Sequence, residues 1–422
     1  MKILHINNFF TKYGGAENSL WKISNLLKNK GNKIYYFATD KQPYFIDNYE
    51  YSKYFPKYLD KRRSNIKDII NIFYNFEVKN NLENYLKEIQ PDLIITHNIL
   101  FHLTPSIFDA CKKFNIPIVM YIQDPRLFCP GGLLSYSDKY CYEEPCIAGN
   151  PISCIKNRCK LSSLKASVIS ALNFIFVRTQ KLFNKCDAII CLSEALKNLA
   201  VKSGTPSCKI KVISHFIEDE KLLIKPVYKN KNYFLYVGRL DREKGVHFLI
   251  EAMKNVSSAI QLHVVGDGCE KENLISQKES LNLNNIKFLG HLSGQELEEE
   301  YKNCIATILP CNWFEAFGLT NIESFLYGKP VIASHLAAIP EIIDEGVNGI
   351  LVPPTDINAL SAAIEKLYYN PDLVIKMGKK GRNKVEKLYT AEVYWDKFLN
   401  EVLLEFNVLD CHSQRSNEAL EA

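Results

Sequence analysis

The stretch Tyr233-Phe234-Leu235-Tyr236-Val237-Gly238 decides the fold, because it starts a second series of apolar runs after a break in the pattern. It follows residues 218–232, which are dense in Lys and acidic residues, contain one Pro and are interpreted as an interdomain linker. Its apolar residues form a run short enough for a buried parallel strand, which the glycine ends. The sequence therefore predicts one domain before the linker and a similar one after it.

Short apolar runs alternate with helix-length amphipathic segments in both halves of the chain. The expected strands are 2–6, 33–37, 93–95, 118–122, 188–192, 233–237, 261–265, 286–289, 304–309 and 330–333. The expected helices include 17–28, 80–89, 356–369 and 391–406. This alternation predicts an α/β protein with two doubly wound parallel sheets. We place the domains at 1–217 and 230–385, and expect a last helix over 386–406 to cover the second domain or cross back to the first.

The composition excludes several classes of protein. The chain has 422 residues, enough for two or three domains, and its 47% hydrophobic and 23% charged residues exclude a disordered or collagen-like chain. A net charge of +5 is too small to indicate nucleic-acid binding. The first residues lack the apolar core of a secretory signal, and the longest apolar stretch, 166–177, is too short to cross a membrane. We therefore expect a cytoplasmic location.

The block Trp313-Phe314-Glu315-Ala316-Phe317-Gly318-Leu319-Thr320-Asn321-Ile322-Glu323 carries the strongest chemical signal. Gly318 allows a turn before a helix over 319–327, whose first free amides attract an anion such as a phosphate. Glu315 and Glu323 flank this helix start. Carboxylates beside an anion are useful when they accept hydrogen bonds from hydroxyls, which suggests a phosphate ligand rich in sugar. Two solvated surface acids would give the same spacing.

Three further glycine-containing turns follow predicted strands. Arg239 and Lys244 lie after Gly238, at the carboxyl end of a sheet, where two cations would neutralise a diphosphate leaving group. Tyr13-Gly14-Gly15 opens a helix, and Gly266-Asp267-Gly268 follows the strand over 261–265. Neither turn has the three spaced glycines of the dinucleotide fingerprint, so hydride transfer is disfavoured.

These motifs together resemble glycosyltransferase family 4. The resemblance rests on the order and spacing of Gly14-Gly15-Ala16-Glu17, Gly238-Arg239 through Lys244-Gly245, Val265 to Gly268, Phe288-Leu289-Gly290 and the block from Glu315 to Glu323 with Gly328-Lys329-Pro330-Val331-Ile332-Ala333 behind it. It covers residues 1–390 approximately. It implies the GT-B fold, in which two Rossmann-like domains face each other across a cleft, and transfer of a sugar from a nucleotide diphosphate donor with retention of configuration.

The resemblance also implies roles for individual residues. Arg239 and Lys244 correspond to the diphosphate clamp, Glu323 to the acid that holds the donor ribose, and Glu315 to the acid that contacts the donor sugar. The further donor-binding positions are Gly15, Gly238, Gly266, Phe317, Gly318, Leu319 and Thr320. Because cations and helix amides meet the departing charge, the family needs no catalytic metal, and we expect none here.

Two positions depart from the family pattern. The usual His-Asp after the strand over 118–122 is Gln123-Asp124 here, and the usual Asn-Gly after Ile213 is His215-Phe216. Glutamine cannot exchange a proton, although it can hydrogen-bond a sugar hydroxyl, so we keep Gln123 with the catalytic residues. His97 and Asp124 are placed on the acceptor side. A structural loop histidine would be equally consistent with the sequence at position 97.

The cysteines cluster in one long loop. Cys141, Cys146, Cys154 and Cys159 fall close together, with Cys129 upstream, so four thiolates could hold a structural zinc ion. The two-residue gap of a zinc knuckle is absent, and free thiols and disulfides remain open.

A basic segment follows the cysteines. Residues 151–190 contain seven Lys or Arg and a single acid, Asp187, around the helically spaced stripe Leu164, Val168, Leu172 and Ile175. The stripe is interpreted first as a core face. The bracketing charges favour peripheral contact with an anionic membrane surface. These charges are Lys156, Arg158, Lys160, Lys165, Arg178, Lys181 and Lys185.

The sequence thus predicts a retaining hexosyltransferase that uses a UDP- or GDP-sugar to extend a glycan or a lipid-linked acceptor in surface polysaccharide synthesis. A sugar-nucleotide epimerase of the same fold would share the nucleotide site but need no acceptor. A non-catalytic partner protein dominated by the zinc loop is the third alternative.

Overall fold

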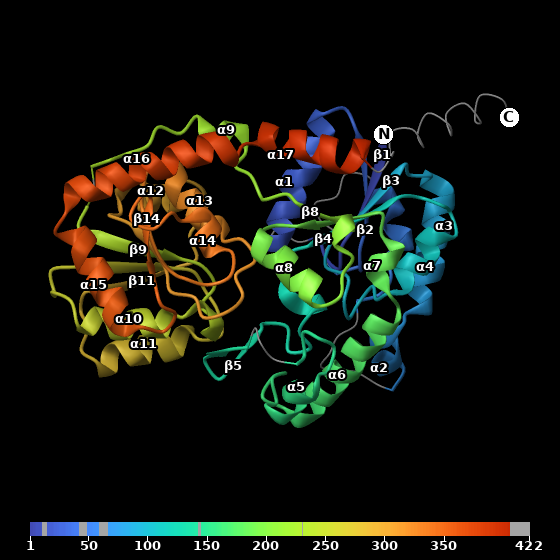
Figure 1. Ribbon diagram of the computed structural model, residues 1–422, viewed down its shortest axis with the longest axis horizontal. Coiled ribbons are helices and arrows are strands. Elements are labelled where there is room, and N and C mark those ends of the chain that lie inside the picture. The colour runs from blue at the N-terminus through green and yellow to red at the C-terminus, as the bar shows by residue number, and fades with distance from the viewer. Residues whose placement is uncertain (11–14, 42–48, 59–65, 142–144, 230, 406–422) are drawn as a thin grey trace. The chain divides into compact units, whose positions relative to one another are not determined.

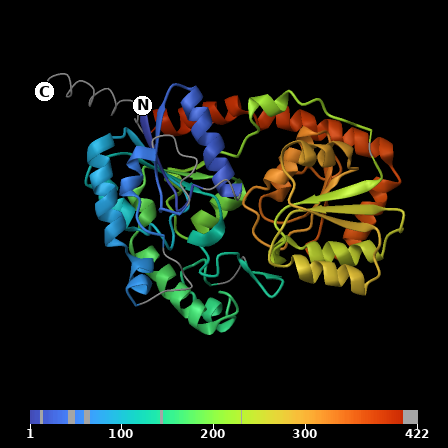
Figure 2. The same ribbon diagram turned by 180° about the vertical axis from the view of Figure 1, so that it is seen from behind.

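The computed structural model describes residues 1–10, 15–41, 49–58, 66–141, 145–229 and 231–405 (Figures 1 and 2). It divides into two compact units. Unit 1 comprises Met1–Gly132, Glu143–Ile213 and Tyr394–Ala422, and unit 2 comprises Leu133–Tyr142 and Ser214–Val393. Each unit has its own parallel six-stranded sheet with helices packed against it, so the predicted α/β class is confirmed.

The sheet of unit 1 has the strand order β2-β1-β3-β4-β7-β8. Its strands are β1 (Lys2–Ile6), β2 (Lys33–Phe37), β3 (Leu93–Thr96), β4 (Ile118–Ile122), β7 (Ala188–Cys191) and β8 (Ile210–Val212). All neighbouring strands pair in parallel. The central strands β3, β4 and β7 are buried along their whole length, as expected for a parallel sheet covered on both faces.

The helices of unit 1 flank this sheet, and several begin at a capping side chain. They are α1 (Gly15–Asn29), α2 (Ile66–Phe73), α3 (Phe76–Ile89), α4 (Ser106–Lys112), α5 (Ile152–Lys156), α6 (Leu164–Thr179), α7 (Leu182–Lys185) and α8 (Glu194–Lys202), with short 3-10 helices at Tyr49–Tyr54, Pro125–Leu127 and Ser207–Lys209. Asn75, Ser163 and Ser193 each accept a hydrogen bond from a first-turn amide of α3, α6 and α8. Such caps satisfy amides that the helix itself cannot pair.

The sheet of unit 2 has the order β11-β10-β9-β12-β13-β14. Its strands are β9 (Tyr233–Val237), β10 (Gln261–Val265), β11 (Ile286–Gly290), β12 (Thr307–Leu309), β13 (Val331–Ser334) and β14 (Gly349–Val352). Strand β12 is shorter than the predicted run over 304–309, because Cys304 still caps the preceding helix. The strand β14 was not predicted. The order reverses between β9 and β12, which is where ligands bind in such sheets.

The helices of unit 2 enclose one apolar core that includes Phe234, Leu249 and Ile364. They are α9 (Asp219–Leu222), α10 (Val246–Lys254), α11 (Lys271–Ser280), α12 (Gly294–Asn303), α13 (Leu319–Leu326), α14 (Ile339–Ile342), α15 (Ile357–Tyr368) and α16 (Pro371–Leu388), with a 3-10 turn η5 at Arg242–Lys244. The predicted linker is tied into this unit. The buried guanidinium of Arg382 in α16 donates to the carbonyls of Leu222, Ile224 and Leu326 at 2.5–3.0 Å.

Two short segments change unit relative to the order of the chain. The antiparallel hairpin of β5 (Ser135–Tyr136) and β6 (Lys139–Tyr140) groups with unit 2, although the loop that carries it starts and ends in unit 1. Helix α17 (Ala391–Phe398) continues as a π-helix, Leu399–Leu404, and from Tyr394 onward the chain groups with unit 1. The hydroxyls of Tyr394 and Tyr121 are hydrogen-bonded there.

Helix α6 contradicts the prediction that its apolar stripe is a core face. Leu164, Leu172 and Ile175 are 52%, 53% and 43% exposed. The buried face instead carries Ser167, Ser170 and Asn173, whose side chains bond the Lys160 amide and the carbonyls of Pro130 and Ile72. The buried face also carries Ala171, Phe174 and Val177, and the polar residues can lie beside them because neighbouring backbone groups pair with their side chains. Helical spacing identifies a stripe but not the direction in which it faces.

Candidate active site

The loop after β9 lies at the point where the strand order of unit 2 reverses. Arg239 is exposed, and its guanidinium forms ion pairs with Asp241 and with Glu243, the latter at 3.3 Å. The Tyr236 hydroxyl donates to the Arg239 carbonyl at 2.7 Å and fixes the backbone of this loop. The predicted cation therefore sits on the predicted loop, with two carboxylates as its partners.

Lys244 and Glu315 form the best enclosed ion pair of this site. Their Nζ and Oε2 atoms are 2.9 Å apart, and both side chains are 14% exposed. The indole Nε1 of Trp313 donates to the same oxygen at 3.1 Å, and the ammonium lies 4.5 Å from the Trp313 ring centroid. A cation held between a carboxylate and an aromatic face keeps its charge at a fixed place. Sequence reasoning paired Lys244 with Arg239 and gave Trp313 no role.

Helix α13 begins at this ion pair with an uncapped end. Gly318 precedes it with φ of 95°, a left-handed conformation that suits glycine, and no side chain caps the first amides. A Cβ at Gly318 would lie 2.6 Å from Asn321 Nδ2. Asn321 is 1% exposed, and within the described residues neither polar atom of its side chain has a hydrogen-bond partner. An uncapped helix start beside an unsatisfied buried amide is suited to an anion.

The remaining residues of the predicted block surround this helix start. Leu319 and Thr320 lie in its first turn and are half-buried. Phe317 is buried, with ring centroids 5.3 Å from His215 and 5.7 Å from Tyr389, so the departure at His215 has a packing role. Each of these residues therefore contributes to the shape of the site through its backbone or ring.

Glu323 lies one turn further along α13. Its Oε2 accepts a hydrogen bond of 3.2 Å from the hydroxyl of Tyr301 in α12. Burial raises the pKa of Tyr301 well above its ordinary value, so the phenol stays protonated and donates. One oxygen of the half-buried carboxylate is thus fixed, and a carboxylate of this kind can accept further hydrogen bonds from hydroxyls.

Gly238 and Gly266 approach each other at the ends of β9 and β10. Gly266 has φ of 140°, and a Cβ there would lie 1.8 Å from the Gly238 carbonyl oxygen. Their amides continue the ladder, bonding the carbonyls of Val265 and Gly290. The structure accounts for both glycines by close packing of backbone, which keeps the loop with Arg239 near the sheet.

The hairpin adds a residue that the sequence did not point to. Asp138 binds the Arg242 guanidinium through two contacts, one of them 3.2 Å long, and its carbonyl accepts from Asn312 Nδ2 at 2.8 Å. His247 Nε2 lies 3.7 Å from the Asp138 carboxylate, and burial lowers the His247 pKa. Asp138 thereby links two segments of the site. It contacts Arg242 in η5, the turn that ends at Lys244, and Asn312, which precedes Trp313 after β12. Asp138 and Arg242 are 104 positions apart, so the local sequence gives no signal for this contact.

In unit 1 the predicted residues lie at the carboxyl ends of neighbouring strands. Gln123 follows β4, His97 follows β3, and Gln123 Nε2 lies 3.1 Å from His97 Nδ1. Asp124 caps the 3-10 turn after it, accepting from the Arg126 amide at 2.9 Å, and pairs with the Arg126 side chain. Gly15 is the first described residue of α1, whereas Gly14 lies outside the described residues.

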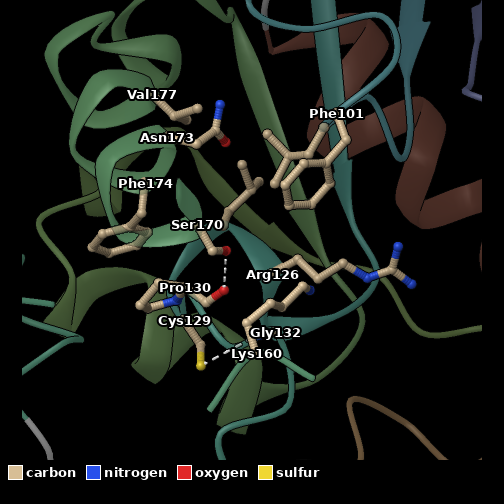
Figure 3. A pocket seen from close by; sticks show the side chains of 12 residues that line it. Phe101, Arg126, Cys129, Pro130, Gly132, Lys160, Ser170, Asn173, Phe174 and Val177 are labelled. Atoms are coloured by element: carbon tan, nitrogen blue, oxygen red, sulfur yellow. Dashed lines mark hydrogen bonds between the residues drawn. The ribbon is translucent and has the colours of Figure 1, made fainter. Parts of the chain in front are cut away.

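A cavity in unit 1 lies beside the cysteine loop (Figure 3). Ser170, Asn173, Phe174 and Val177 of α6 line one side, and Arg126, Cys129, Gly132 and Lys160 line the other. Ser170 donates to the Pro130 carbonyl at 2.6 Å, and the Gly132 amide donates to Cys129 Sγ at 3.2 Å. The first bond fixes the loop against the helix, and the second closes a turn within the loop.

Several thiols of the cysteine loop lie near one another. A hydrogen bond with Cys159 and the nearby thiols of Cys129 and Cys146 raise the pKa of Cys154, together with burial. Cys129, which the sequence placed upstream of the cluster, is among these neighbours. In the part of the chain that the structure describes, no three His, Cys, Asp or Glu side chains are grouped so as to hold a metal ion. The zinc site stays a prediction.

Comparisons with known proteins match both halves of the chain. The family described as "Glycosyltransferase Family 4" matches residues 13–221, and the family described as "Glycosyl transferases group 1" matches residues 218–384. A similar relative is the O-antigen chain mannosyltransferase C of Escherichia coli, 28% identical over 40% of this chain and 46% of its own length. Another is the capsular polysaccharide biosynthesis glycosyltransferase CapM of Staphylococcus aureus, 29% identical over 53% of this chain and 63% of its own length. The matches to these curated relatives thus span about half of their length.

Solved structures show the same fold. That of Anabaena Alr3699/HepE in complex with UDP and glucose has a TM-score of 0.64 and 18% identity, and the match covers 95% of this chain and 99% of that one. The predicted GT-B class of two Rossmann-like units is confirmed.

Proposed function

We propose that this chain, which belongs to glycosyltransferase family 4, is a retaining hexosyltransferase that moves a sugar from a nucleotide diphosphate donor to a glycan or lipid-linked acceptor. The observation that carries the proposal is the enclosed Lys244–Glu315–Trp313 cluster at the uncapped start of α13, where Asn321 lacks a partner among the described residues. This arrangement offers one cation, a set of helix amides and a buried amide to a single anion, beside carboxylates that can accept hydroxyls.

The proposed chemistry follows from where charge develops. When the bond between the sugar and the diphosphate breaks, the leaving group gains negative charge, and fixed donors that await it lower the barrier. Lys244, Arg239 and the amides of Gly318 and Leu319 take this role. Glu323 accepts the ribose hydroxyls and Glu315 those of the sugar. Glu315 is also ion-paired with Lys244. The group proposed to bind the sugar is therefore in direct contact with a group proposed to bind the diphosphate.

The relatives support the choice of substrate class. Two are named as transferases of O-antigen and capsular polysaccharide synthesis, and one similar structure contains UDP and glucose. We therefore propose that this chain uses a UDP- or GDP-sugar as donor and a surface polysaccharide as acceptor.

Thermal shift with a panel of nucleotide sugars tests the donor. A ligand bound only by the folded state raises the melting temperature, and the true donor should do so more than its free nucleotide. Transfer is then followed with that donor and oligosaccharide or polyprenyl-phosphate sugar acceptors, and NMR coupling constants give the anomeric configuration of the product. An inverted product would refute retention. Turnover of the donor without any acceptor would instead indicate the epimerase alternative.

We further propose that the surface formed by α5 and α6 rests on an anionic membrane, at its inner face. Helix α5 packs on α6 (Figure 1). Beside the exposed stripe of α6, Ile152 and Leu161 are 52% and 84% exposed. Large apolar side chains grouped in this way, next to cations, suit the interface of a lipid bilayer.

The structure separates the cations of this segment into two groups. Lys156, Arg158, Lys165 and Lys181 are exposed. Lys160 bonds the Gly131 carbonyl, Arg178 bonds the carbonyls of Ile147 and Ser203, and Lys185 pairs with Asp109. The first group is proposed to meet lipid phosphates, and the second holds the fold together. Among the described residues no helix is long and apolar enough to cross a bilayer.

Flotation with vesicles tests this surface. We expect binding to vesicles that contain phosphatidylglycerol, weakened by salt, and little binding to phosphatidylcholine alone. The double variant Leu172→Glu/Ile175→Glu should not float, whereas Leu223→Glu, at an even more exposed leucine of unit 2, should float like the wild type. Equal flotation of all three proteins would refute the proposal.

A further inference from the structure

The tip of the β5–β6 hairpin has a backbone conformation that few residue types adopt readily. The register pairs Tyr136 with Lys139, so Ser137 and Asp138 form a two-residue loop. Their φ angles are 45° and 59°, the pattern of a type I′ turn, in which asparagine, aspartate and glycine are the usual residues. Glycine would therefore satisfy the turn at position 138, and the turn alone does not require a carboxylate there.

The Asp138 carboxylate is used outside the hairpin. Its Oδ1 accepts a hydrogen bond from Arg242 Nε at 3.2 Å, and its Oδ2 accepts one from Arg242 Nη2. Paired hydrogen bonds of this kind fix the orientation of a guanidinium as well as its distance. The Arg242 side chain is 57% exposed and that of Asp138 is 28% exposed, so the pair adds little to the stability of the fold. What the pair determines is where η5, Arg242–Lys244, lies relative to the hairpin.

The backbone of Asp138 is attached to the segment that follows β12. Its carbonyl accepts a hydrogen bond from Asn312 Nδ2 at 2.8 Å, and Asn312 is 4% exposed. The backbone amide of Asn312 in turn donates to the carbonyl of Glu243, in η5, at 2.9 Å. Asp138, η5 and Asn312 therefore form a closed ring of contacts, in which the hairpin holds both segments.

The enclosed ion pair of the site is carried by the same two segments. Lys244 is the last residue of η5, and Glu315 lies three positions after Asn312. The Lys244 ammonium is 2.9 Å from Glu315 Oε2 and 4.5 Å from the ring centroid of Trp313. A displacement of η5 would change both distances. The place of the ammonium therefore depends on the contacts that hold η5.

We infer that Asp138 is a positioning residue for the transferase reaction, which acts through Arg242 and η5 to keep the Lys244 ammonium where the leaving diphosphate gains charge. The inference rests on the proposed function and deepens it, because it adds to the donor site a residue of the hairpin that is not itself assigned to the donor. Stabilisation of a developing charge depends on donors that are already in place, so a displaced ammonium costs rate.

Fluorine NMR tests the positioning without any substrate. The chain has three tryptophans, which 5-fluorotryptophan labels, and Trp313→Phe identifies the signal of Trp313. In Asp138→Gly, which suits the turn and removes the carboxylate, the Trp313 signal should shift or broaden, because the ammonium beside its ring moves. Ser137→Gly, at the other residue of the turn, should leave that signal in place. An unchanged Trp313 signal in Asp138→Gly, or an equal change in Ser137→Gly, would overturn the inference.

Steady-state kinetics tests whether Asp138 acts through Arg242. Asp138→Gly should lower kcat about 10-fold with little change in KM for the donor, because a displaced ammonium weakens binding of the transition state more than that of the ground state. Arg242→Ala should cause a similar loss. The double variant should lose no more than either single variant, since both changes break the same contact. Ser137→Gly should transfer sugar like the wild type.

The outcomes of the two experiments separate the inference from the proposed function. An unchanged kcat in Asp138→Gly, or losses that multiply in the double variant with Arg242→Ala, would overturn the inference while leaving the transferase intact. A wild type that transfers no sugar would refute the proposed function, and the fluorine spectra would still decide whether Asp138 positions Lys244. Circular dichroism checks the fold, which both glycine variants should keep because glycine suits a type I′ turn.

Discussion

Both units place polar side chains where the strand order of their sheet reverses. In unit 2 these side chains form ion pairs, and in unit 1 they form hydrogen bonds. In unit 2 the strand order reverses between β9 and β12, and charged side chains gather there, with Lys244 and Glu315 as the enclosed pair. In unit 1 the reversal lies between β1 and β3, and the buried row of His5, His97 and Gln123 lies there. One region holds an enclosed ion pair, and the other holds a buried row of hydrogen-bonded side chains.

The largest expected effect is on the charged site. Lys244→Ala removes the ammonium that we assign to the leaving diphosphate and leaves Glu315 without its cation. We expect kcat/KM to fall about 1,000-fold, as for the loss of a main charge-stabilising donor. Steady-state transfer assays measure this, with circular dichroism to confirm the fold. Lys254→Ala, at the exposed end of α10, should behave like the wild type.

A second change in the same unit separates donor binding from chemistry. Glu323→Ala removes the acceptor of the Tyr301 hydroxyl and the group that we assign to the ribose. We expect a loss of about 100-fold in kcat/KM, mostly through KM for the donor. Isothermal titration with the free nucleotide should show the same loss of affinity. Full activity of both Glu323→Ala and Lys244→Ala would show that the charged site is not the active site.

Acid should weaken the neutral site first. The pKa of His5 is about 3 in the folded protein and 6.5 in the unfolded chain, so between these values only the unfolded chain binds the proton. Stability is therefore lost as the pH falls from about 6.5 toward 3, by about 2 kcal/mol between pH 7 and pH 5. Urea unfolding at both pH values measures this. His5→Phe should lack this part of the dependence, and an identical dependence in the variant would contradict the assignment.

Alkali should strengthen the charged unit through Lys329. This lysine is fully buried, and burial lowers its pKa from 10.5 to about 8. Between these values the unfolded chain binds more protons, so stability rises with pH, by about 2 kcal/mol between pH 7 and pH 9.5. Lys329→Met should be more stable than the wild type at pH 7 and lack this rise. If both proteins respond equally to pH, Lys329 keeps its charge in the fold.

The comparison also shows which parts of the molecule the sequence can predict. The charged site was predicted because its residues are local. Glu315, Gly318 and Glu323 lie within nine consecutive positions, and Lys244 follows the apolar run 233–237, which is typical of a buried strand. The neutral row was found only in part. Gln123 and His97 were named separately, but their link to His5 spans 92 residues and His5 looks like an ordinary member of a buried strand.

Two other features were not predicted correctly from the sequence, for different physical reasons. The strands β5 and β6 are two residues each, too short for a periodic pattern, and their attachment depends on Asp138 and a distant arginine. The stripe of α6 was recognised, but its direction was wrong, because the buried face joins Phe174 and Val177 to Ser170 and Asn173, which donate to the carbonyls of Pro130 and Ile72. Such bonds have no counterpart in the local sequence.

The grouping of the hairpin with unit 2 affects any attempt to recombine this protein. A chimaera that joins residues 230–393 to the first half of a relative would discard Asp138 and the partners of Arg382 in one cut. Arg242 would lose its carboxylate, and a buried guanidinium would lose carbonyls from Leu222 and Ile224. A version of unit 2 intended for exchange must begin at Ser214 and bring Leu133–Tyr142 with it, so the exchangeable segment is discontinuous in the gene.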